Sequence, residues 1–300
     1  MDWLSVHFPV SGVDTCVWVP PLVAFAVSAV TSMGGVSGAV LLLPFQVSVL
    51  GFTTPSVSAT NFVYNLVAIP GGLRTYVKER RMAWPLAWIV AAGTLPGVLI
   101  GFLLRVRYLP DPRSFKLFAG CVLLGVGAWL LRGLLARPRG PGDAAGLPPG
   151  TAVRTTSLSL TRAGFEFRGE RFSFSTPGMF ALAFAVGILG GTYGIGGGAI
   201  IAPFCVAVFG LPIHAVAGAA LVGTFLTSIA GVLVYSLVPA GAGISARPDW
   251  LLGLLFGVGG LAGMHVGARL QRFVSARFIQ GMLGVVVLGV ALHYVHEFFR

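Results

Sequence analysis

Charged side chains are scarce in this 300-residue chain: they make up 10% of the residues, and only nine of them are acidic. A soluble globular domain carries about a quarter charged residues. Hydrophobic residues make up 56% of the chain and stand in long runs with almost no charge, which is the pattern of membrane spans. The shortage of charge therefore argues against a soluble domain and predicts an all-α polytopic membrane protein.

Acidic residues are scarcer than basic ones: the chain has twenty Lys and Arg but nine Asp and Glu, which gives a net charge of +11. In a soluble protein this excess would suggest a nucleic-acid partner. Here the basic residues gather in short segments between apolar runs, at residues 74–81, 105–116, 132–176 and 269–277. Such segments orient membrane proteins, so we expect the lipid bilayer as a partner and no nucleic acid.

Cysteine and the usual catalytic groups are also rare. Cys16, Cys121 and Cys205 stand alone, without a CxxC pair or a histidine at ligand spacing, so we expect neither a disulfide framework nor a metal site. The spans hold no paired carboxylates and no Ser/His/Asp set. We therefore predict that the chain is not an enzyme and needs no cofactor. The amino terminus lacks a basic segment and does not resemble a cleaved signal peptide.

Glycine, in contrast, is abundant, with 43 residues. Six of the nine residues at 190–198 are glycines within the apolar run 179–209, and a weaker cluster at 33–38 interrupts the run 19–52. Glycine destabilises helices, so both clusters predict broken helices. The 34 residues of the first run fit either a re-entrant hairpin of two half-helices or one long interrupted helix. The alternative for the glycines is simple close packing between helices.

The two glycine clusters belong to an internal repeat. A shift of 159 residues gives fifteen identities without a gap across positions 24–76, and places Gly35 and Gly38 on Gly194 and Gly197. We interpret the chain as two duplicated halves with about eight membrane segments in all. The expected divisions are a first repeat at 1–133, a polar linker at 134–176 and a second repeat at 177–300.

The number of crossings decides how the halves are oriented. If each glycine-broken segment enters and leaves on one side, each half crosses three times and the repeats are inverted. The basic residues 74–81, 132–176 and 269–277 then lie inside, and both termini lie outside. Full crossing by the broken segments would instead give parallel repeats. The positive-inside rule favours the inverted arrangement.

The polar linker has two parts. Residues 137–150 are rich in Pro and Gly and predict a flexible connection, whereas residues 155–160, 165–168 and 171–175 alternate with period two. The alternation predicts a small β-meander on the cytoplasmic side. This meander is either an ordered linker or a docking surface.

A helix that starts at a glycine break presents free backbone N–H groups at the positive end of its dipole, which suits a small anion. Paired discontinuous helices are a recurring plan in transporters. We expect such half-helices at 39–49 and 199–208. Each polar side chain nearby also suits a simple interhelical hydrogen bond. The predicted substrate-binding residues are Gly35, Ser37, Gly38, Thr60, Asn61, Tyr64, Asn65, Gly194, Gly196, Gly197, Gly198, Thr224, Thr227 and Ser228.

His265 is the ionisable residue that stands out within a predicted span. Ionisable groups inside membranes are functional candidates, so it is a candidate proton or anion relay. It lies four residues before Arg269, and an interfacial structural role is the alternative.

Several motifs together resemble one known family, the sulfite exporter TauE/SafE family of bacterial inner-membrane proteins. The matching motifs are GIGGG at 194–198 with Pro203, GLP at 210–212, TSIAG at 227–231, ATNFVYN at 59–65 and PGG at 70–72. The resemblance implies a multi-pass inner-membrane protein that moves sulfite, sulfonates or related organic anions. The chain departs from the family pattern in its short glycine run at 34–38 and in Ala219-Ala220, where a hydroxyl pair is common. The two half-sites are therefore unequal.

We predict a secondary transporter that exports a small anion. Export from a negative-inside cell runs downhill by about 2.3 kcal/mol per charge per 100 mV, so a uniporter suffices, with proton coupling as the alternative. The rival functions are a membrane scaffold or assembly partner, and an intramembrane enzyme, which the missing catalytic groups disfavour. A homo-oligomer is left open.

Overall fold

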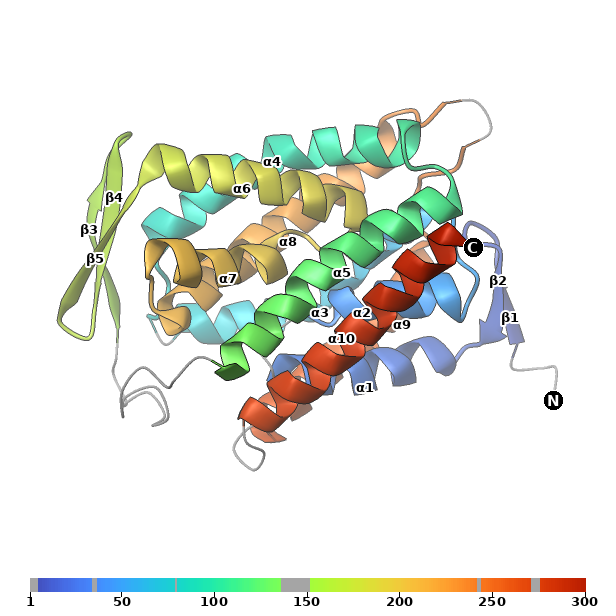
Figure 1. Cartoon of the computed structure of the whole chain (residues 1–300), viewed down its shortest axis with the longest axis horizontal. Helices are drawn as coiled ribbons and strands as arrows, with labels where there is room; N and C mark the ends of the chain where they lie inside the picture. The colour runs from blue at the N-terminus through green and yellow to red at the C-terminus, as the bar shows by residue number, and fades with distance from the viewer. Residues whose placement is uncertain (1–4, 34–36, 79, 136–151, 242–243, 271–275) are drawn as a thin grey trace.

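The computed structural model describes residues 5–33, 37–78, 80–135, 152–241, 244–270 and 276–300, and these residues are mostly helical (Figure 1). The helices are α1 (Val19–Met33), α2 (Ala39–Ser48), α3 (Ser56–Lys78), α4 (Trp84–Arg107), α5 (Pro112–Leu135), α6 (Thr176–Tyr193), α7 (Gly198–Phe209), α8 (Ile213–Leu237), α9 (Trp250–Leu270) and α10 (Ala276–Phe299). The strands are β1 (Ser5–Phe8), β2 (Val13–Cys16), β3 (Val153–Leu158), β4 (Arg162–Phe167) and β5 (Glu170–Ser175).

Six of the described helices are long and apolar enough to cross a membrane: α4, α5, α6, α8, α9 and α10. The chain is therefore a polytopic, mostly helical membrane protein, as its composition predicts. The helix α3 is not among the six. It carries several amides and hydroxyls in its first half and basic residues in its last turns, which lower its hydropathy.

Both predicted helix breaks are present. The helix α1 ends at Met33 and α2 begins at Ala39, while α6 ends at Tyr193 and α7 begins at Gly198. Gly35, a predicted site residue, lies outside the described residues. The half-helices therefore begin at or within one residue of the positions that the glycine clusters indicate.

Each broken pair folds back on itself. The ring of Phe209, at the end of α7, lies 6.5 Å from the ring of Phe174 in β5, the strand that leads into α6. At the other end of the molecule, Ser48 at the end of α2 hydrogen bonds over 2.7 Å to Tyr294, near the end of α10. The helix α1 also begins at that end (Figure 1). The pairs α1–α2 and α6–α7 are therefore helical hairpins, not single interrupted helices.

The helices α3 and α8 pack antiparallel at the centre of the bundle. Phe62 lies against Gly231, whereas Gly72, ten residues further along α3, lies against Leu221. The helices α5 and α10 also run antiparallel, because Lys116 pairs with Glu297 and Gly127 lies against Leu288.

Glycine stripes let two further pairs of helices approach closely. A Cβ added at Gly97 of α4 would lie 2.6 Å from the carbonyl oxygen of Phe184 in α6. Gly263 of α9 meets the backbone of Phe25 in α1 in the same way. The glycines at residues 93–101 and 253–267 therefore form packing faces.

The β-strands lie at opposite ends of the bundle (Figure 1). The predicted meander forms an antiparallel sheet in the order β3-β4-β5, with Phe165 and Phe167 of β4 buried. The hairpin β1–β2 was not predicted, and it buries Phe8 and Val13. We call these two ends the sheet end and the hairpin end. The predicted linker at 137–150 lies outside the described residues.

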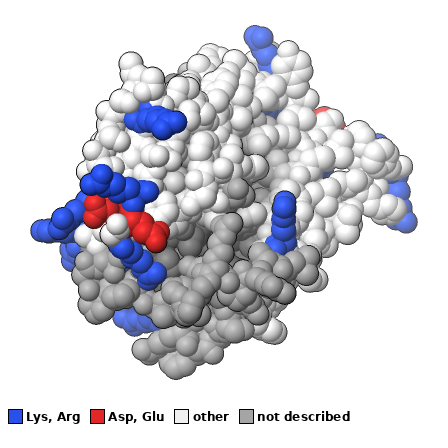
Figure 2. All heavy atoms as spheres, turned by 60° about the vertical axis from the view of Figure 1, so that its left-hand side comes forward, with Lys and Arg blue, Asp and Glu red and all other residues white. Residues whose placement is uncertain are grey.

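The basic residues are distributed unequally between the two ends. Figure 2 turns the sheet end forward and shows blue Lys and Arg side chains outnumbering red acidic ones. The elements that meet there supply Arg74, Lys78, Arg80, Arg81, Arg132, Arg154, Arg162, Arg168, Arg171 and Arg269, against Glu166 and Glu170.

Two predicted basic loops are shorter than expected. Arg74 and Lys78 belong to the last turns of α3, not to a loop. Arg105 and Arg107 close α4, and Lys116 lies in the second turn of α5. The helices extend beyond the ends of the hydrophobic runs and include these basic residues. The lengths of the runs therefore underestimate the lengths of the helices.

Candidate functional site

The tips of the two helical hairpins meet inside the bundle. The hydroxyl of Tyr193, at the end of α6, donates a 2.9 Å hydrogen bond to the carbonyl oxygen of Val40 in α2. Ser58 of α3 donates to the carbonyl oxygen of Thr192 over 2.9 Å. Side chains of α3 and α6 thus connect the two halves of the chain at the start of α2.

Asn61 joins both hairpins directly. Its amide nitrogen Nδ2 donates to the carbonyl oxygen of Ala39 at 3.2 Å and to that of Gly194 at 3.1 Å. Its Oδ1 accepts a longer bond, of 3.4 Å, from Gln46 of α2. Asn61 is fully buried. A single predicted site residue therefore contacts the start of one half-helix and the glycine turn before the other.

The turn between α6 and α7 requires glycine. Gly194, Gly196 and Gly197 have φ of +91°, +74° and +76°, where L side chains are strained. A Cβ at Gly194 would also lie 2.5 Å from the carbonyl oxygen of Ser58. At Gly197 the nearest atom would be 3.4 Å away, so this position has room for a methyl group.

The start of α7 faces α8. Gly198 lies directly against Thr224, and a Cβ at Gly196 would lie 3.0 Å from the hydroxyl oxygen of Ser228. Thr224 donates its hydroxyl to the carbonyl oxygen of Ala220 in its own helix, over 2.9 Å. No side chain caps the start of α7. The positive end of this helix dipole is therefore directed toward uncharged side chains of α8.

The start of α2 faces two hydroxyls. A Cβ at Gly38 would lie 2.7 Å from Oγ of Ser28 and closer still to the hydroxyl of Tyr64, and these two hydroxyls are 2.8 Å apart. Ser37 Oγ accepts a 3.3 Å hydrogen bond from the backbone N–H of Ala39. The two helix starts are therefore lined by different side chains, a serine and a tyrosine at α2 against a threonine and a serine at α7.

Three side chains of this region keep buried polar atoms without a hydrogen-bond partner among the described residues. They are Asn65, through both amide atoms, Ser228, through its hydroxyl, and Gln46, through Oε1. A buried polar group without a partner costs about 1–3 kcal/mol, and so it favours any ligand that completes its bonds. The antiparallel register of α3 and α8 places Asn65 and Ser228 at the same level.

Not all of the predicted residues join this group. Thr60 accepts a 2.9 Å hydrogen bond from the backbone N–H of Asp249, toward the hairpin end. Thr227 donates to Thr94 of α4 over 2.9 Å, which is an interhelical bond. His265 is exposed on α9 and stands apart from the hairpin tips. We name the group that does come together the central site: Gly38, Gln46, Asn61, Tyr64, Asn65, Gly194, Gly196, Gly197, Gly198, Thr224 and Ser228.

Two buried ionisable residues escaped the sequence analysis, and both lie toward the hairpin end. Arg105 is fully buried, with its guanidinium carbon 3.7 Å from the ring centre of Phe115 and one terminal nitrogen donating to the carbonyl oxygen of Thr53 at 3.1 Å. Asp249 accepts hydrogen bonds from Ser11 and from the backbone of Leu252. In sequence both residues look like ordinary charges at the end of an apolar run.

The central site, as far as the structure describes it, contains no charged side chain. Nor do the described residues anywhere form a cluster of three or more His, Cys, Asp or Glu residues suited to a metal ion. What the site offers is dipoles: two helix starts, two amides and several hydroxyls. Such groups bind a small anion reversibly, without the strong attraction of a buried cation.

Helical hairpins that meet tip to tip inside a multi-pass bundle define the class of membrane transporters built on discontinuous helices. Residues 21–294 match the sequence model of the family described as sulfite exporter TauE/SafE. The chain belongs to this family, which confirms the resemblance carried by its glycine and threonine motifs.

Curated relatives extend over nearly the whole chain. A probable membrane transporter protein, YunE, of Bacillus subtilis is 24% identical over 279 residues, which cover 89% of this chain and 93% of that protein. A probable membrane transporter protein of Xylella fastidiosa strain 9a5c is 27% identical over 281 residues, covering 91% of each chain. No solved structure gives a significant match.

Proposed function

We propose that this chain is a secondary transporter that exports a small anion, such as sulfite, a sulfonate or a related organic anion, across the bacterial inner membrane. The family description names sulfite, and the relatives are named as probable membrane transporters. The proposal specifies transport and not catalysis, with the anion bound between the two hairpin tips.

The observation that carries the proposal is that Asn65 and Ser228, at one level of the central site, both keep buried donors without partners among the described residues. Both side chains are fully buried, and their donor groups have no partner in the described structure. They lie at one level of the α3–α8 pair, beside hairpin tips that Asn61 joins. An oxyanion would accept hydrogen bonds from both side chains and would lie near the positive end of α7.

The distribution of charge supports an orientation. The sheet end carries most of the arginines and so would face the cytoplasm, with the hairpin end outside. An anion that leaves the cell in this direction moves down the membrane potential, by about 2.3 kcal/mol per charge per 100 mV. A uniporter is therefore energetically sufficient.

We further propose that the two halves are inverted repeats. Under the 159-residue shift α3 corresponds to α8, and chain order then pairs α1 with α6, α4 with α9 and α5 with α10. The packing follows this exchange, because α1 packs on α9 as α6 packs on α4. The equivalent helices α3 and α8 run antiparallel, as do α5 and α10. Such pairs are expected for a pseudo-twofold axis in the membrane plane.

The proposal is tested by anion efflux from proteoliposomes loaded with labelled sulfite or a labelled alkanesulfonate. We expect the wild type to release at least one of them, and faster when the lumen is negative. Asn65→Leu keeps the approximate size of the side chain but removes its amide donor, so it should slow release at least tenfold. Ser114→Ala is the control, because Ser114 forms a solvent-exposed hydrogen bond with Asp111 at the start of α5, away from the central site. Wild-type flux no faster than that of empty vesicles with every anion would refute the proposal.

A further inference from the structure

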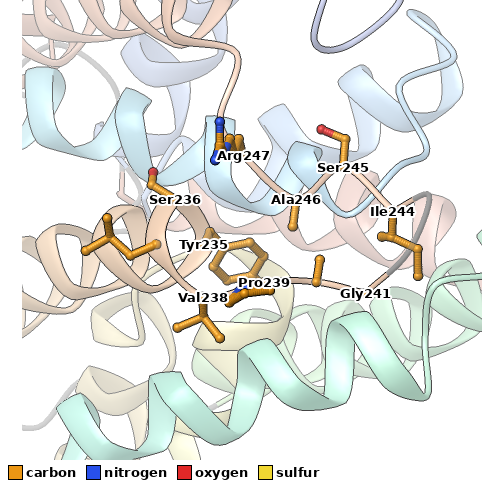
Figure 3. A pocket seen from close by; sticks show the side chains of 11 residues that line it. Tyr235, Ser236, Val238, Pro239, Gly241, Ile244, Ser245, Ala246 and Arg247 are labelled. Carbon is orange, nitrogen blue, oxygen red and sulfur yellow. The ribbon is translucent and has the colours of Figure 1, made fainter.

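A second polar feature lies at the hairpin end, in the loop between α8 and α9. There residues 235–241 and 244–247 line an open pocket of about 420 Å³. Figure 3 shows the loop curling around the ring of Tyr235, with Ser236 and Arg247 at one end of the pocket. The volume is in the range of small-molecule sites.

Two of the lining side chains can bind an oxyanion. Arg247 is exposed and makes no ion pair or hydrogen bond with any other described residue. Ser236 lines the same pocket, and its hydroxyl is buried without a hydrogen-bond partner in the described structure. A guanidinium and a hydroxyl on one cavity suit a small oxyanion, because each can donate to its oxygens.

The acidic group nearby is already engaged. Asp249 lies two residues after Arg247, but its carboxylate accepts hydrogen bonds from Ser11, at 2.9 Å, and from the backbone N–H of Leu252, at 3.2 Å. The loop itself is fixed to the start of α3, where Ser56 donates to the carbonyl oxygen of Ser245 over 3.0 Å. The arginine therefore stands on an anchored loop, and the nearby carboxylate is held by other groups.

Tyr235 separates the pocket from the central site. Its ring is buried, and its hydroxyl donates a 2.9 Å hydrogen bond to the carbonyl oxygen of Gly191, in the last turn of α6 before the glycine turn. The ring of Phe102 packs 4.8 Å from it, and the buried Arg105 follows one turn later on α4. One aromatic side chain therefore touches both the pocket and the second hairpin.

The equivalent position in the first half is also a tyrosine. Tyr76 precedes Tyr235 by 159 residues and lies at the end of α3, toward the sheet end. The guanidinium of Arg81 lies 5.1 Å from the centre of its ring. Each end of the bundle thus combines a tyrosine of a central helix with an arginine of the following segment.

We propose that the Tyr235–Arg247 pocket is an anion-binding vestibule, through which the transported oxyanion passes on the side opposite the sheet. The inference rests on the proposed function and adds a second binding step to it. Arg247 and Ser236 hold the anion after it leaves the central site, and Tyr235 moves aside to connect the two. The positive charges of Arg247 and Arg105 raise the local concentration of anions at this mouth.

The test compares Arg247→Gln with Arg300→Gln, which removes the same charge from the same end but outside the pocket. In oriented proteoliposomes, sulfite counterflow gives a half-saturating concentration for each face. We expect Arg247→Gln to raise the half-saturating concentration at the hairpin-end face by roughly tenfold, because a charge-assisted hydrogen bond is lost. The half-saturating concentration at the sheet-end face and the maximal rate of transport should not change. Ser236→Ala should act in the same direction, with a smaller effect.

Two outcomes would overturn the vestibule in different ways. In the first, transport is intact and the half-saturating concentration is the same for Arg247→Gln, Arg300→Gln and the wild type. This result would refute the vestibule but not the proposed function. Absence of transport in the wild type as well would remove both.

Discussion

At the scale of single residues, the central site depends on polar groups whose bonds are incomplete. Asn61 is satisfied and structural, since it holds Ala39 and Gly194 together. Asn65 and Ser228 are buried with free donors. This difference separates side chains that build the site from side chains that are available to a ligand.

Ser228→Ala should reduce anion flux without harming the fold. The hydroxyl has no partner to lose in the described structure, so its removal relieves a buried polar group and should leave thermal stability equal or slightly higher. Flux in proteoliposomes should fall about tenfold, the equivalent of about 1.4 kcal/mol of anion binding. Flux equal to that of the control Ser114→Ala would mean that the Ser228 hydroxyl has no part in transport.

The glycines of the turn should differ in their tolerance of alanine. At Gly197 a methyl group has room, so Gly197→Ala should cost only the strain of φ +76° and ψ −36°, outside the left-handed helical region, about 1–3 kcal/mol. At Gly194 the strain of a left-handed backbone adds to a collision with the backbone of Ser58, and Gly194→Ala should fail to fold or should melt well below the other variant. The melting temperatures of the two variants in detergent test this prediction, and equal melting temperatures would contradict the described turn.

The sequence named most of the side chains that the structure brings together here, and their role in binding stays a prediction. The directions in which these side chains point could not be read from the sequence. Asn61 and Asn65 lie one turn apart on α3 and both face the hairpins, yet Thr60, their neighbour, turns toward Asp249. Gln46 was missed because one amide in an apolar half-helix gives no periodic signal. Ser28 was missed because its bond to Tyr64 depends on the packing of α1 against α3.

At the scale of elements, the glycine breaks were the most predictable feature, because their cause is local to the backbone. The hairpin β1–β2 was not predicted, since its four-residue strands are too short for a clear alternation. What stabilises it is tertiary: Phe8 is buried, and Ser11 bonds to Asp249 through both its hydroxyl and its backbone N–H.

Asp249 should matter more to stability than its partner in the hairpin. The carboxylate accepts from the backbone of Leu252 as the cap of α9 and also holds Ser11. Asp249→Ala should therefore cost about 0.5–2 kcal/mol from the lost cap alone. Ser11→Ala removes only the bond to the hairpin and should lower the melting temperature less. The reverse order would show that the hairpin, and not the start of α9, depends on this carboxylate.

At the scale of the whole molecule, the two hairpins and the exchange of helix partners support the proposed internal repeat. The identities concentrate around the breaks, where backbone geometry restricts the choice of residue. The outer helices α5 and α10 keep little of the repeat, because their exposed apolar faces accept many side chains. The sequence alone could not decide between inverted and parallel halves. Hydropathy does not show whether a broken segment crosses the membrane or returns to the side from which it entered.

The inverted arrangement predicts which surfaces a reagent can reach from each side of the membrane. The free Cys16 and Cys121 are partly or fully exposed and are first replaced by serine. In cells carrying that background, Arg300→Cys should react with an impermeant maleimide added outside, whereas Leu160→Cys, in the turn between β3 and β4, should react only after permeabilisation. Both side chains are exposed in the structure. Outside labelling of Leu160→Cys, or protection of Arg300→Cys, would reverse or abolish the proposed orientation.

The central claim is that the two hairpins share one anion site, and the stoichiometry of binding tests it most directly. Sulfite binding to the purified protein is measured by calorimetry in an Arg247→Gln background, which removes the proposed vestibule. We predict one anion per chain, bound at least tenfold more weakly by both Asn65→Leu and Ser228→Ala, since each half supplies part of a single site. Two anions per chain, with each variant losing only one, would show independent half-sites and contradict the account.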